Sequence, residues 1–494
     1  MPKDLLSNSI GKATAWSFAA EIAAKIIVPV TNIILARLLT PEAFGVIASI
    51  NMVVSFADMF SQAGFQKYLV QHEYENKESL FRGASVAFWT YLSISLLFWF
   101  LICIFRNPIA DFVGNPGYGT GLSIAALSLP LMSLSCIQEA LFQRQLNYRI
   151  LFYRRVFVSL LPFFVTIPLA VVGFGYWALI IGTLAGNILK AVMLTVVSEW
   201  KPNFFFSFSL LKQMFSFSVW TLLESVAMWA STYIDILIIS NALGPFYTGL
   251  YKNSQTTVTS ILSIVTGATT TVLFSALSRS QSDEKRYNEL FYSFQKNVAV
   301  FVMPLGAGIF WFSDLITNVL LGSQWVKASP FIGVWGLCTS LVCVYGTFSR
   351  EVYRSKGKPK ISLFAQMLHI IFIVPVCLYG VHLGFDKLIY YRSFAFLQII
   401  LVHSLFVKIF FDISPMKMIW RTKEPVLCTL LMSALIFILQ KIFVDEFIWE
   451  LVLILLSVLF YFFMLCMFKE YRLLVCDKFS RLTEKYRLFS FVRK

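Results

Sequence analysis

Apolar residues run through this chain in stretches of about 20 residues, the length a helix needs to cross the hydrocarbon core of a bilayer. Short polar connections separate these stretches. The stretches do not alternate apolar and polar positions, as the strands of an outer-membrane barrel do. The pattern predicts an all-α polytopic membrane protein.

Taken as helices, the apolar stretches predict about fourteen membrane spans. They lie at residues 12–39, 43–65, 84–105, 121–142, 156–174, 176–197, 215–242, 246–276, 298–320, 330–349, 361–383, 387–411, 425–444 and 447–468. The composition agrees, since 58% of the residues are hydrophobic and only 14% are charged. The mean hydropathy of +0.74 is far above that of a water-soluble domain.

Two similar bends interrupt the pattern, "ARLLTPEAFGVIAS" near the start and "NALGPFYTGLYKNS" near the middle. When the sequence is aligned on them, Pro41 matches Pro245 and Gly45 matches Gly249. Proline cannot continue the preceding helix, and glycine permits a close turn. The matches predict that the chain contains an internal repeat.

The repeat predicts two pseudo-equivalent six-helix lobes, residues 1–199 and 200–412. Each lobe has an even number of spans, so both begin on the same side and are related by an axis along the membrane normal. Residues 413–494 add a C-terminal helix pair and a basic, amphipathic tail. Paired lobes of this kind are typical of alternating-access transporters.

The net charge of +15 would be compatible with nucleic-acid binding, but the positions of the basic residues argue against it. Most of the 41 Lys and Arg residues fall at the N-terminus, in every second connection and in the C-terminal tail. This asymmetry follows the positive-inside rule and predicts that both termini are cytoplasmic. The expected surroundings are a lipid bilayer, and nucleic acid is not an expected partner.

Other chemistries are also disfavoured. The first apolar stretch is too long for a cleaved signal peptide. The eight cysteines form no CxxC pair, so neither a disulfide nor a metal site is expected. The phrase "IGKAT" lacks the upstream glycine of a P-loop, which disfavours ATP use. A membrane glycosyltransferase or polymerase would need acidic exterior loops, and the longest one, 106–120, offers only Arg106 and Asp111; an enzyme is not expected.

Several phrases in order along residues 10–410 resemble a known family: "ARLLTPEAFGVIA", "GFQKYLVQ", "FQRQLNYRILFYRRV", "YIDILIISNALGPFYTGLYKNSQ" and "LGSQWVKASP". They resemble Wzx-type flippases, in the polysaccharide-export branch of the multidrug/oligosaccharidyl-lipid/polysaccharide exporter superfamily. One departure concerns acids. Many relatives carry Asp at the place of Gln62, whereas the nearby acid here is Asp58.

The resemblance implies a protein of the bacterial inner membrane with two six-helix lobes in a V around a polar cavity. It implies that the chain moves an undecaprenyl-diphosphate-linked oligosaccharide from the cytoplasmic to the outer leaflet for surface polysaccharide biosynthesis. A polysaccharide polymerase and a chain-length regulator are the further partners it implies. The sequence leaves open the sugar repeat, the coupling ion and the oligomeric state.

Charged residues inside predicted spans are candidates for function, because an ionised group in hydrocarbon is unfavourable without a partner or water. Lys25 lies near the middle of the first span, and Glu21 lies one turn before it at a spacing that favours an ion pair. The functional hypothesis is that Lys25 attracts the diphosphate while Glu21 restrains it. The alternative is a structural ion pair between helices.

Three acids are candidates for coupling transport to H⁺ or Na⁺, since coupling requires a carboxylate that changes partners between states. They are Asp235, Glu224 and Asp58. Asp235 matches an acidic position that is common in the resembled family. A packing hydrogen bond is the alternative for each.

Three further residues are candidates for substrate binding. Arg37 and Lys252 flank the two bends and would guide a phosphate or sugar chain, although snorkelling to the interface needs no function. Trp229 lies on the first helix of the second lobe, where an aromatic ring would stack on a sugar, although lipid-facing packing and interfacial belts explain most aromatic residues of membrane helices.

A multidrug-type exporter of the same superfamily, ion-coupled and specific for small molecules, is the alternative function. Such a transporter would prefer an acidic cavity for cationic substrates, whereas the central charge of the first span, Lys25, is basic.

Overall fold

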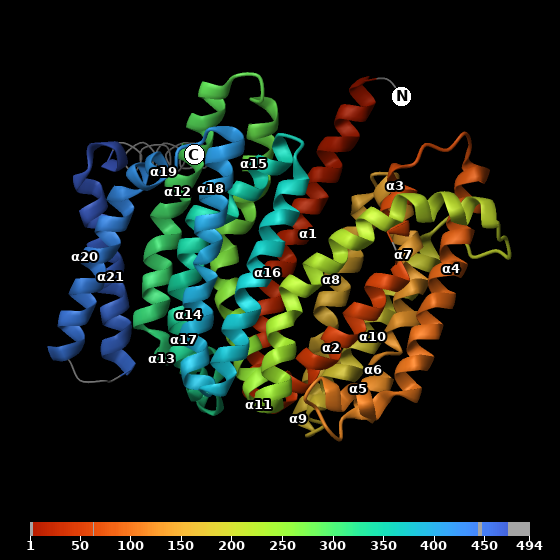
Figure 1. Cartoon of the computed structure of the whole chain (residues 1–494), viewed down its shortest axis with the longest axis horizontal. Helices are drawn as coiled ribbons and strands as arrows, with labels where there is room; N and C mark the ends of the chain where they lie inside the picture. The colour runs from red at the N-terminus through yellow and green to blue at the C-terminus, as the bar shows by residue number, and fades with distance from the viewer. Residues whose placement is uncertain (1–2, 63, 443–446, 473–494) are drawn as a thin grey trace, which may run out of the picture. The chain divides into compact units, whose positions relative to one another are not determined.

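The computed structural model describes residues 3–62, 64–442 and 447–472, and every regular element in these ranges is helical (Figure 1). The all-α prediction is confirmed for this part of the chain. The elements up to the middle of the chain are α1 (Lys3–Leu38), α2 (Pro41–Gln62), α3 (Phe65–Gln71), α4 (Lys77–Ile104), α5 (Arg106–Phe112), α6 (Gly119–Ala125), α7 (Ser128–Arg144), α8 (Tyr148–Phe164), α9 (Thr166–Val171), α10 (Tyr176–Val197) and α11 (Phe208–Arg279).

Short irregular helices are interspersed among longer ones in the rest of the chain. The elements are α12 (Glu284–Trp311), α13 (Ser313–Ile316), η1 (Thr317–Leu321), η2 (Ser323–Ala328), α14 (Ser329–Val342), η3 (Cys343–Thr347), α15 (Ser349–Ser355), α16 (Pro359–His382), α17 (Phe385–Phe396), α18 (Gln398–Phe411), α19 (Pro415–Arg421), α20 (Lys423–Ile442) and α21 (Phe447–Met467). Here η1 and η3 are π-helical and η2 is a 3₁₀ helix.

Within the described residues, 11 helices are long and apolar enough to cross a membrane. The number rises to 12 if α12 and the segment Ser313–Leu321, which meet at 84°, form one bent span. The predicted number of fourteen is therefore not confirmed. The structural count does not include α1, and it takes the two spans predicted on either side of the second bend as one.

The second bend lies inside α11, which has 72 residues and would be about 108 Å long as a straight helix. That length far exceeds the roughly 30 Å of a hydrocarbon core. The backbone leaves helical geometry at Gly244, where φ is 79° and ψ is −179°, and Pro245 follows. Because a positive φ is easy only for glycine, this residue pair sets the place of the break and confirms the predicted bend.

The chain divides into two compact units that are interleaved along the sequence. The first holds the chain up to Thr257 together with Leu320–Ala328 and Gln366–Arg392. The second holds Val258–Val319, Ser329–Ala365 and the described residues from Ser393 onward. These units differ from the predicted lobes, 1–199 and 200–412, whose boundaries remain predictions.

The first unit contains a helical bundle in which α2, α4, α7 and α10 pack against one another (Figure 1). One apolar cluster joins α2, α4, α6, α7 and α10 and includes Val46, Ile102 and Leu122. A second joins α3, α4 and α7 with Trp200 and Met214. Such clusters hold helices together by close packing, because lipid provides little hydrophobic driving force between them.

The second unit is organised around α12, which packs against α14 and α20. The pair α20 and α21 lies side by side, and its buried face includes Met432, Ile436 and Leu453 (Figure 1). Tyr461 donates a hydrogen bond to the carbonyl of Val300 at 2.8 Å, which ties α21 to α12. The helix pair predicted after residue 412 is thus packed on this unit.

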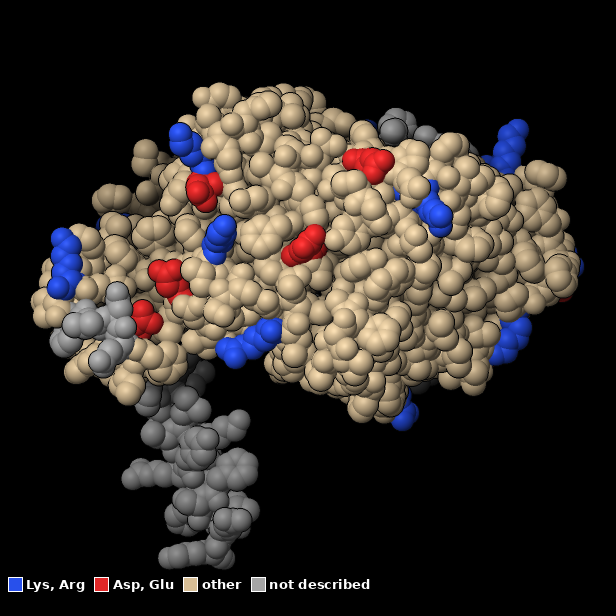
Figure 2. Space-filling view, turned by 90° about the horizontal axis from the view of Figure 1, so that it is seen from below, with Lys and Arg blue, Asp and Glu red and all other residues tan. Residues whose placement is uncertain are grey.

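Figure 2 shows one face of the molecule, seen from below Figure 1. Its charged side chains are few and scattered, and the basic ones do not gather into a patch.

The two bends that the sequence repeats pack directly against each other in the first unit. A Cβ at Gly45 would overlap the carbonyl of Pro245, and a Cβ at Gly249 would overlap the carbonyl of Pro41. Each added Cβ would also lie 2.9 or 3.0 Å from the backbone nitrogen of the other glycine. The repeated residues therefore form a reciprocal crossing of α2 and the second half of α11, which we call the glycine crossing.

Hydrogen bonds hold the end of the first half of α11 beside this crossing. Ser240 donates to the carbonyl of Val113 at 2.6 Å, and Asn241 donates to the carbonyl of Phe112 at 2.8 Å. The hydroxyls of Ser49 and Ser240 lie 2.8 Å apart. The turn that follows α5 thus covers the C-terminal end of this helical segment.

The end of α1 is covered in the corresponding way by η2. Gln324 donates to the carbonyls of Ala36 and Leu39 at 2.7 and 2.9 Å, and Trp325 donates to that of Ala36 at 2.7 Å. These bonds satisfy terminal carbonyls that have no partner within their own helix. In the repeat alignment Ala36 matches Ser240, so a connection covers each helix at the matching position, although the side-chain donors come from η2 in one case and from α11 in the other.

The glycine crossing predicts that even one methyl group will not fit. Gly249→Ala should lower the melting temperature of the purified protein in detergent by several degrees, because overpacking costs about 1–3 kcal/mol. Gly186→Ala is the matched control, since its Cβ would meet Val158 and Leu161 at ordinary distances of 3.8 and 4.0 Å. Equal melting temperatures for the two variants would contradict the close crossing.

Candidate functional site: a polar pocket between α2, α3 and α11

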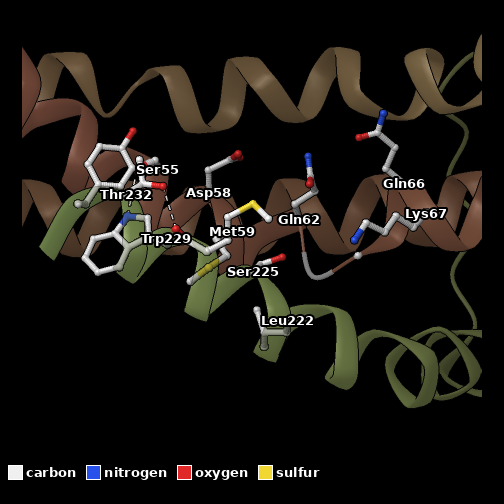
Figure 3. A pocket seen from close by; sticks show the side chains of 13 residues that line it. Ser55, Asp58, Met59, Gln62, Gln66, Lys67, Leu222, Ser225, Trp229 and Thr232 are labelled. Carbon is white, nitrogen blue, oxygen red and sulfur yellow. Dashed lines mark hydrogen bonds between the residues drawn. The ribbon is translucent and has the colours of Figure 1, made fainter. Parts of the chain in front are cut away.

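A pocket of about 340 Å³ opens in the first unit between α2, α3 and the first half of α11 (Figure 3). Polar side chains and aromatic rings both contribute to its wall. The lining residues are Ser55, Asp58, Met59, Gln62, Gly64, Gln66, Lys67, Leu222, Ser225, Met228, Trp229, Thr232 and Tyr233.

The pocket wall has two distinct ends. Figure 3 shows Trp229 and Thr232 at one end, Lys67 and Gln66 at the other, and Asp58 between them. Amides, hydroxyls and a carboxylate offer both donors and acceptors, while aromatic rings offer flat apolar faces. A wall of this composition can accommodate a sugar.

The ring of Trp229 is held in place by two hydrogen bonds. Its Nε1 donates to the carbonyl of Met52 at 3.2 Å and to the hydroxyl of Ser55 at 3.1 Å. Phe56 lies against it with ring centroids 4.8 Å apart, and Tyr233 lies 5.7 Å away. The indole therefore presents a fixed aromatic surface.

The helix α3 forms a rigid wall at the opposite end. Gly64 adopts a left-handed conformation, with φ of 75° and ψ of 6°, and turns the chain between α2 and α3. Phe65, Tyr68 and Leu69 are buried at helical spacing, so the residues between them, Gln66 and Lys67, lie toward the pocket.

Arg144 fixes the other end of α3. Its Nη1 donates to the carbonyls of Leu69, Val70 and His72 at 3.0, 3.3 and 2.5 Å. A guanidinium at a helix C-terminus satisfies carbonyls that lack helical partners and complements the helix dipole. Both ends of α3 are therefore anchored.

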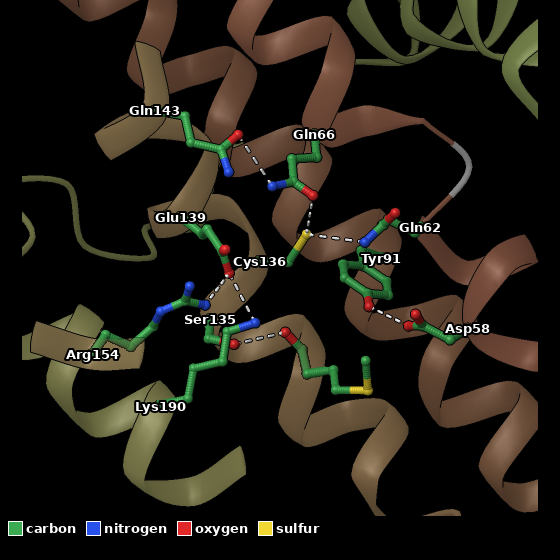
Figure 4. Close-up of polar contacts among 11 residues, drawn as sticks. Asp58, Gln62, Gln66, Tyr91, Ser135, Cys136, Glu139, Gln143, Arg154 and Lys190 are labelled. Atoms are coloured by element: carbon green, nitrogen blue, oxygen red, sulfur yellow. Dashed lines mark hydrogen bonds and ion pairs between the residues drawn. The ribbon is translucent and has the colours of Figure 1, made fainter. Parts of the chain in front are cut away.

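A polar network connects the pocket wall to the interior of the bundle (Figure 4). Tyr91 donates to the carboxylate of Asp58 at 2.5 Å. The Sγ of Cys136 lies 3.6 Å from the Nε2 of Gln62 and 3.9 Å from the Oε1 of Gln66. The wall residues are thus held from behind by side chains of α4 and α7.

An ion cluster lies deeper in the same bundle (Figure 4). The carboxylate of Glu139 on α7 accepts Lys190 of α10 at 2.8 Å and Arg154 of α8 at 2.9 Å. All three side chains are at most 22% exposed. Two cations thus face one carboxylate in this interior, so the buried acid is paired.

An ion pair crosses the α3 end of the pocket. The Nζ of Lys67 lies 3.7 Å from a carboxylate oxygen of Glu224 on α11. Both side chains are 55% exposed, so water screens the pair and its contribution to stability is small.

The structure places the predicted site residues in three groups. Trp229 and Asp58 line the pocket. Glu224 does not line it but pairs with Lys67, which does. Lys25 is half-buried on α1, Arg37 is exposed at its end, and neither lines the pocket. The side chain of Glu21 lies outside the described residues.

Asp235, a candidate for ion coupling, lies in a buried ion pair in the first unit. Its Oδ2 accepts the Nη2 and Nε of Arg392 on α17 at 2.8 and 3.1 Å and the hydroxyl of Tyr251 at 2.5 Å. Both charged side chains are 5% exposed. The candidate Lys252 follows Tyr251, with its Nζ 5.9 Å from the ring centroid of Tyr233.

Sequence reasoning missed Lys67, the two glutamines Gln62 and Gln66, and Arg392. Gln66 and Lys67 belong to the phrase "GFQKYLVQ", in which the helical spacing of the apolar residues Phe65, Tyr68 and Leu69 indicates that the polar residues lie on the other face. Arg392 lies inside the predicted span 387–411, where a charge indicates a buried partner. Within the described residues, no group of three or more His, Cys, Asp or Glu side chains is placed to hold a metal ion.

The fold is similar to that of a solved membrane protein. A solved lipid II flippase, MurJ in an inward closed conformation, matches it with a TM-score of 0.76, covering 94% of this chain and 100% of that one at 17% sequence identity. Identity this low establishes the fold alone.

Sequence comparisons define the family. The family described as polysaccharide biosynthesis protein matches residues 34–330, and the chain belongs to it. The succinoglycan biosynthesis transport protein ExoT of Rhizobium meliloti is 26% identical, over 69% of this chain and 68% of its own length. The lipopolysaccharide biosynthesis protein WzxC of Escherichia coli is 21% identical, over 70% and 67%. The resemblance predicted from the sequence phrases is confirmed.

Removal of the buried cation should destabilise the protein. Arg392→Gln leaves the carboxylate of Asp235 without its guanidinium, which costs about 3–5 kcal/mol for a buried pair. We expect a strongly lowered melting temperature in detergent, and partial recovery in the double variant Asp235→Asn/Arg392→Gln.

The matched control is Lys408→Gln. Lys408 lies 3.4 Å from Asp412 in a pair whose side chains are 55% and 92% exposed, so its loss should leave the melting temperature nearly unchanged. If Arg392→Gln melts like this control, the pair with Asp235 does not stabilise the fold.

Proposed function

We propose that this protein translocates an undecaprenyl-diphosphate-linked oligosaccharide repeat unit across the bacterial cytoplasmic membrane by alternating access, for surface polysaccharide biosynthesis. Both termini are cytoplasmic in this proposal, and a polymerase and a chain-length regulator act on the translocated unit. Family membership and the likeness to transport proteins support the general function.

The observation that carries the substrate assignment is the pocket beside α3. It combines the fixed indole of Trp229 with amides, hydroxyls, one carboxylate and one ammonium. Sugars are bound by stacking on aromatic faces and by hydrogen bonds to such groups. A headgroup that carries sugars and a diphosphate matches this wall better than a purely cationic drug, which would have to lie beside Lys67.

Transport against a gradient would require coupling, and we propose H⁺ or Na⁺ as the driving ion. Asp58 is the preferred carboxylate because it lines the pocket and is bound by the neutral hydroxyl of Tyr91. Asp235 is less suited, since a guanidinium already neutralises it. A carboxylate without a fixed counter-ion can exchange a proton or cation at lower cost.

Translocation can be tested with the purified protein in liposomes that carry the lipid-linked oligosaccharide. The wild-type protein should make saccharide from the inner leaflet accessible to an added lectin, faster than liposomes without protein. Equal rates with and without protein would contradict the proposed function.

Trp229→Ala should weaken binding of the saccharide-bearing lipid about tenfold, since aromatic stacking contributes about 0.5–1.5 kcal/mol beyond the buried area. Trp229→Phe should retain part of the affinity. Trp420→Ala is the control, because Trp420 is 66% exposed on α19 and does not line the pocket. Unchanged affinity in Trp229→Ala would exclude the indole as a sugar surface.

Lys25→Ala should abolish surface polysaccharide in a strain that depends on this protein, with normal amounts of protein in the membrane. Lys25→Arg should retain part of the activity, because a cation at this position, outside the pocket, can still attract an approaching diphosphate. Normal polysaccharide with Lys25→Ala would remove this residue from the mechanism.

A further inference from the structure

Resting on the proposed function, we infer that Lys67 binds the diphosphate of the substrate and that Glu224 is the carboxylate which the diphosphate displaces. Neither role follows from the family match. The inference assigns an orientation to the substrate within the pocket.

The first support is that Lys67 lies on an anchored helix. Buried Phe65, Tyr68 and Leu69 hold one face of α3, and Arg144 holds its C-terminal carbonyls. The position of the Lys67 backbone is thereby fixed while its side chain remains 55% exposed. A binding group on a rigid element loses less conformational freedom when a ligand arrives.

The second support is the weakness of the existing ion pair. At 3.7 Å and with both side chains 55% exposed, the pair of Lys67 and Glu224 is screened by water. A diphosphate offers more negative charge and several acceptor oxygens, and it makes charge-assisted hydrogen bonds with an ammonium. It can therefore compete with the single carboxylate of Glu224 for Lys67.

The third support is the arrangement of charge along the pocket. Asp58 lies between Lys67 and Trp229 (Figure 3), and in its charged form it disfavours a diphosphate at the middle of the pocket. A carboxylate there can instead accept hydrogen bonds from sugar hydroxyls. The diphosphate consequently lies at the α3 end, and the first sugars extend past Asp58 toward Trp229.

The ion pair also has a role when the pocket is empty. Glu224 comes from α11 and Lys67 from α3, so their contact joins the two facing walls. Binding of a diphosphate to Lys67 breaks this contact and frees Glu224. Substrate binding would thereby remove one contact between the two walls at this end.

Binding of undecaprenyl diphosphate without sugar tests the inference directly. The protein is placed in nanodiscs of uncharged phosphatidylcholine, and the dissociation constant is measured with radiolabelled lipid. Lys67→Gln should weaken binding about tenfold or more, because a hydrogen bond to a charged group contributes about 1.5–3 kcal/mol. Lys67→Arg should retain most of the affinity, and Glu224→Gln should bind equally well or more tightly.

Further ligands and a control variant separate the sources of any effect. Undecaprenol, which lacks phosphate, should bind wild type and Lys67→Gln equally weakly, and inorganic diphosphate should compete with the labelled lipid only in proteins that retain a cation at position 67. Lys77→Gln is the matched control. Lys77 forms a similar exposed pair with Glu199, with side chains 65% and 64% exposed, but it lies outside the pocket, so its loss should not alter binding.

Each outcome has a distinct meaning. If Glu224→Gln weakens binding as much as Lys67→Gln, the pair is structural and the inference is overturned. If wild type and Lys67→Gln bind the lipid equally, the inference fails while the proposed function stands. If the wild-type protein binds neither undecaprenyl diphosphate nor its saccharide-bearing form, the proposed function itself fails.

Discussion

The glycine crossing is the constraint on which the first unit depends. Two helix starts, at Pro41 and Pro245, approach so closely that the backbone of each occupies the space of a side chain on the other. In lipid, such close approach replaces the hydrophobic effect as the main source of helix association. The helix that precedes each proline, α1 or the first half of α11, ends close to the segment that covers it, which is η2 for α1 and the turn after α5 for α11. The pocket lies farther along α2 and along the first half of α11, on the other side of the break at Gly244.

The all-helical fold and the two bends could be predicted from the sequence, because long apolar stretches and repeated proline and glycine residues mark them. Proline and glycine at matching places predicted two bends, and both occur. The sequence could not reveal that the two bends contact each other, since that depends on how the helices fold back in space. It also could not give the number of spans, because a break within a continuous helix, as at Gly244, does not show whether the two segments cross separately.

The candidate site was predicted less completely, and the reason lies in what a charge inside an apolar stretch can mean. Asp235, Glu224 and Asp58 were selected by the same argument, yet they have different partners. A guanidinium neutralises Asp235, an ammonium faces Glu224, and a hydroxyl binds Asp58. The partners come from α17, α3 and α4, far away in sequence, so burial and charge state could not be read from the local pattern.

These differences have a consequence for how the pocket would respond to a ligand. A buried ion pair such as that of Asp235 and Arg392 is difficult to break, because separation leaves a charge in a medium of low polarity. The exposed pair of Lys67 and Glu224 exchanges partners readily, because water compensates either charge. A transporter needs both kinds of contact, one that preserves the fold in every state and one that yields to the substrate. In the first unit the durable pair does not line the pocket, whereas the exchangeable pair lies at one end of it.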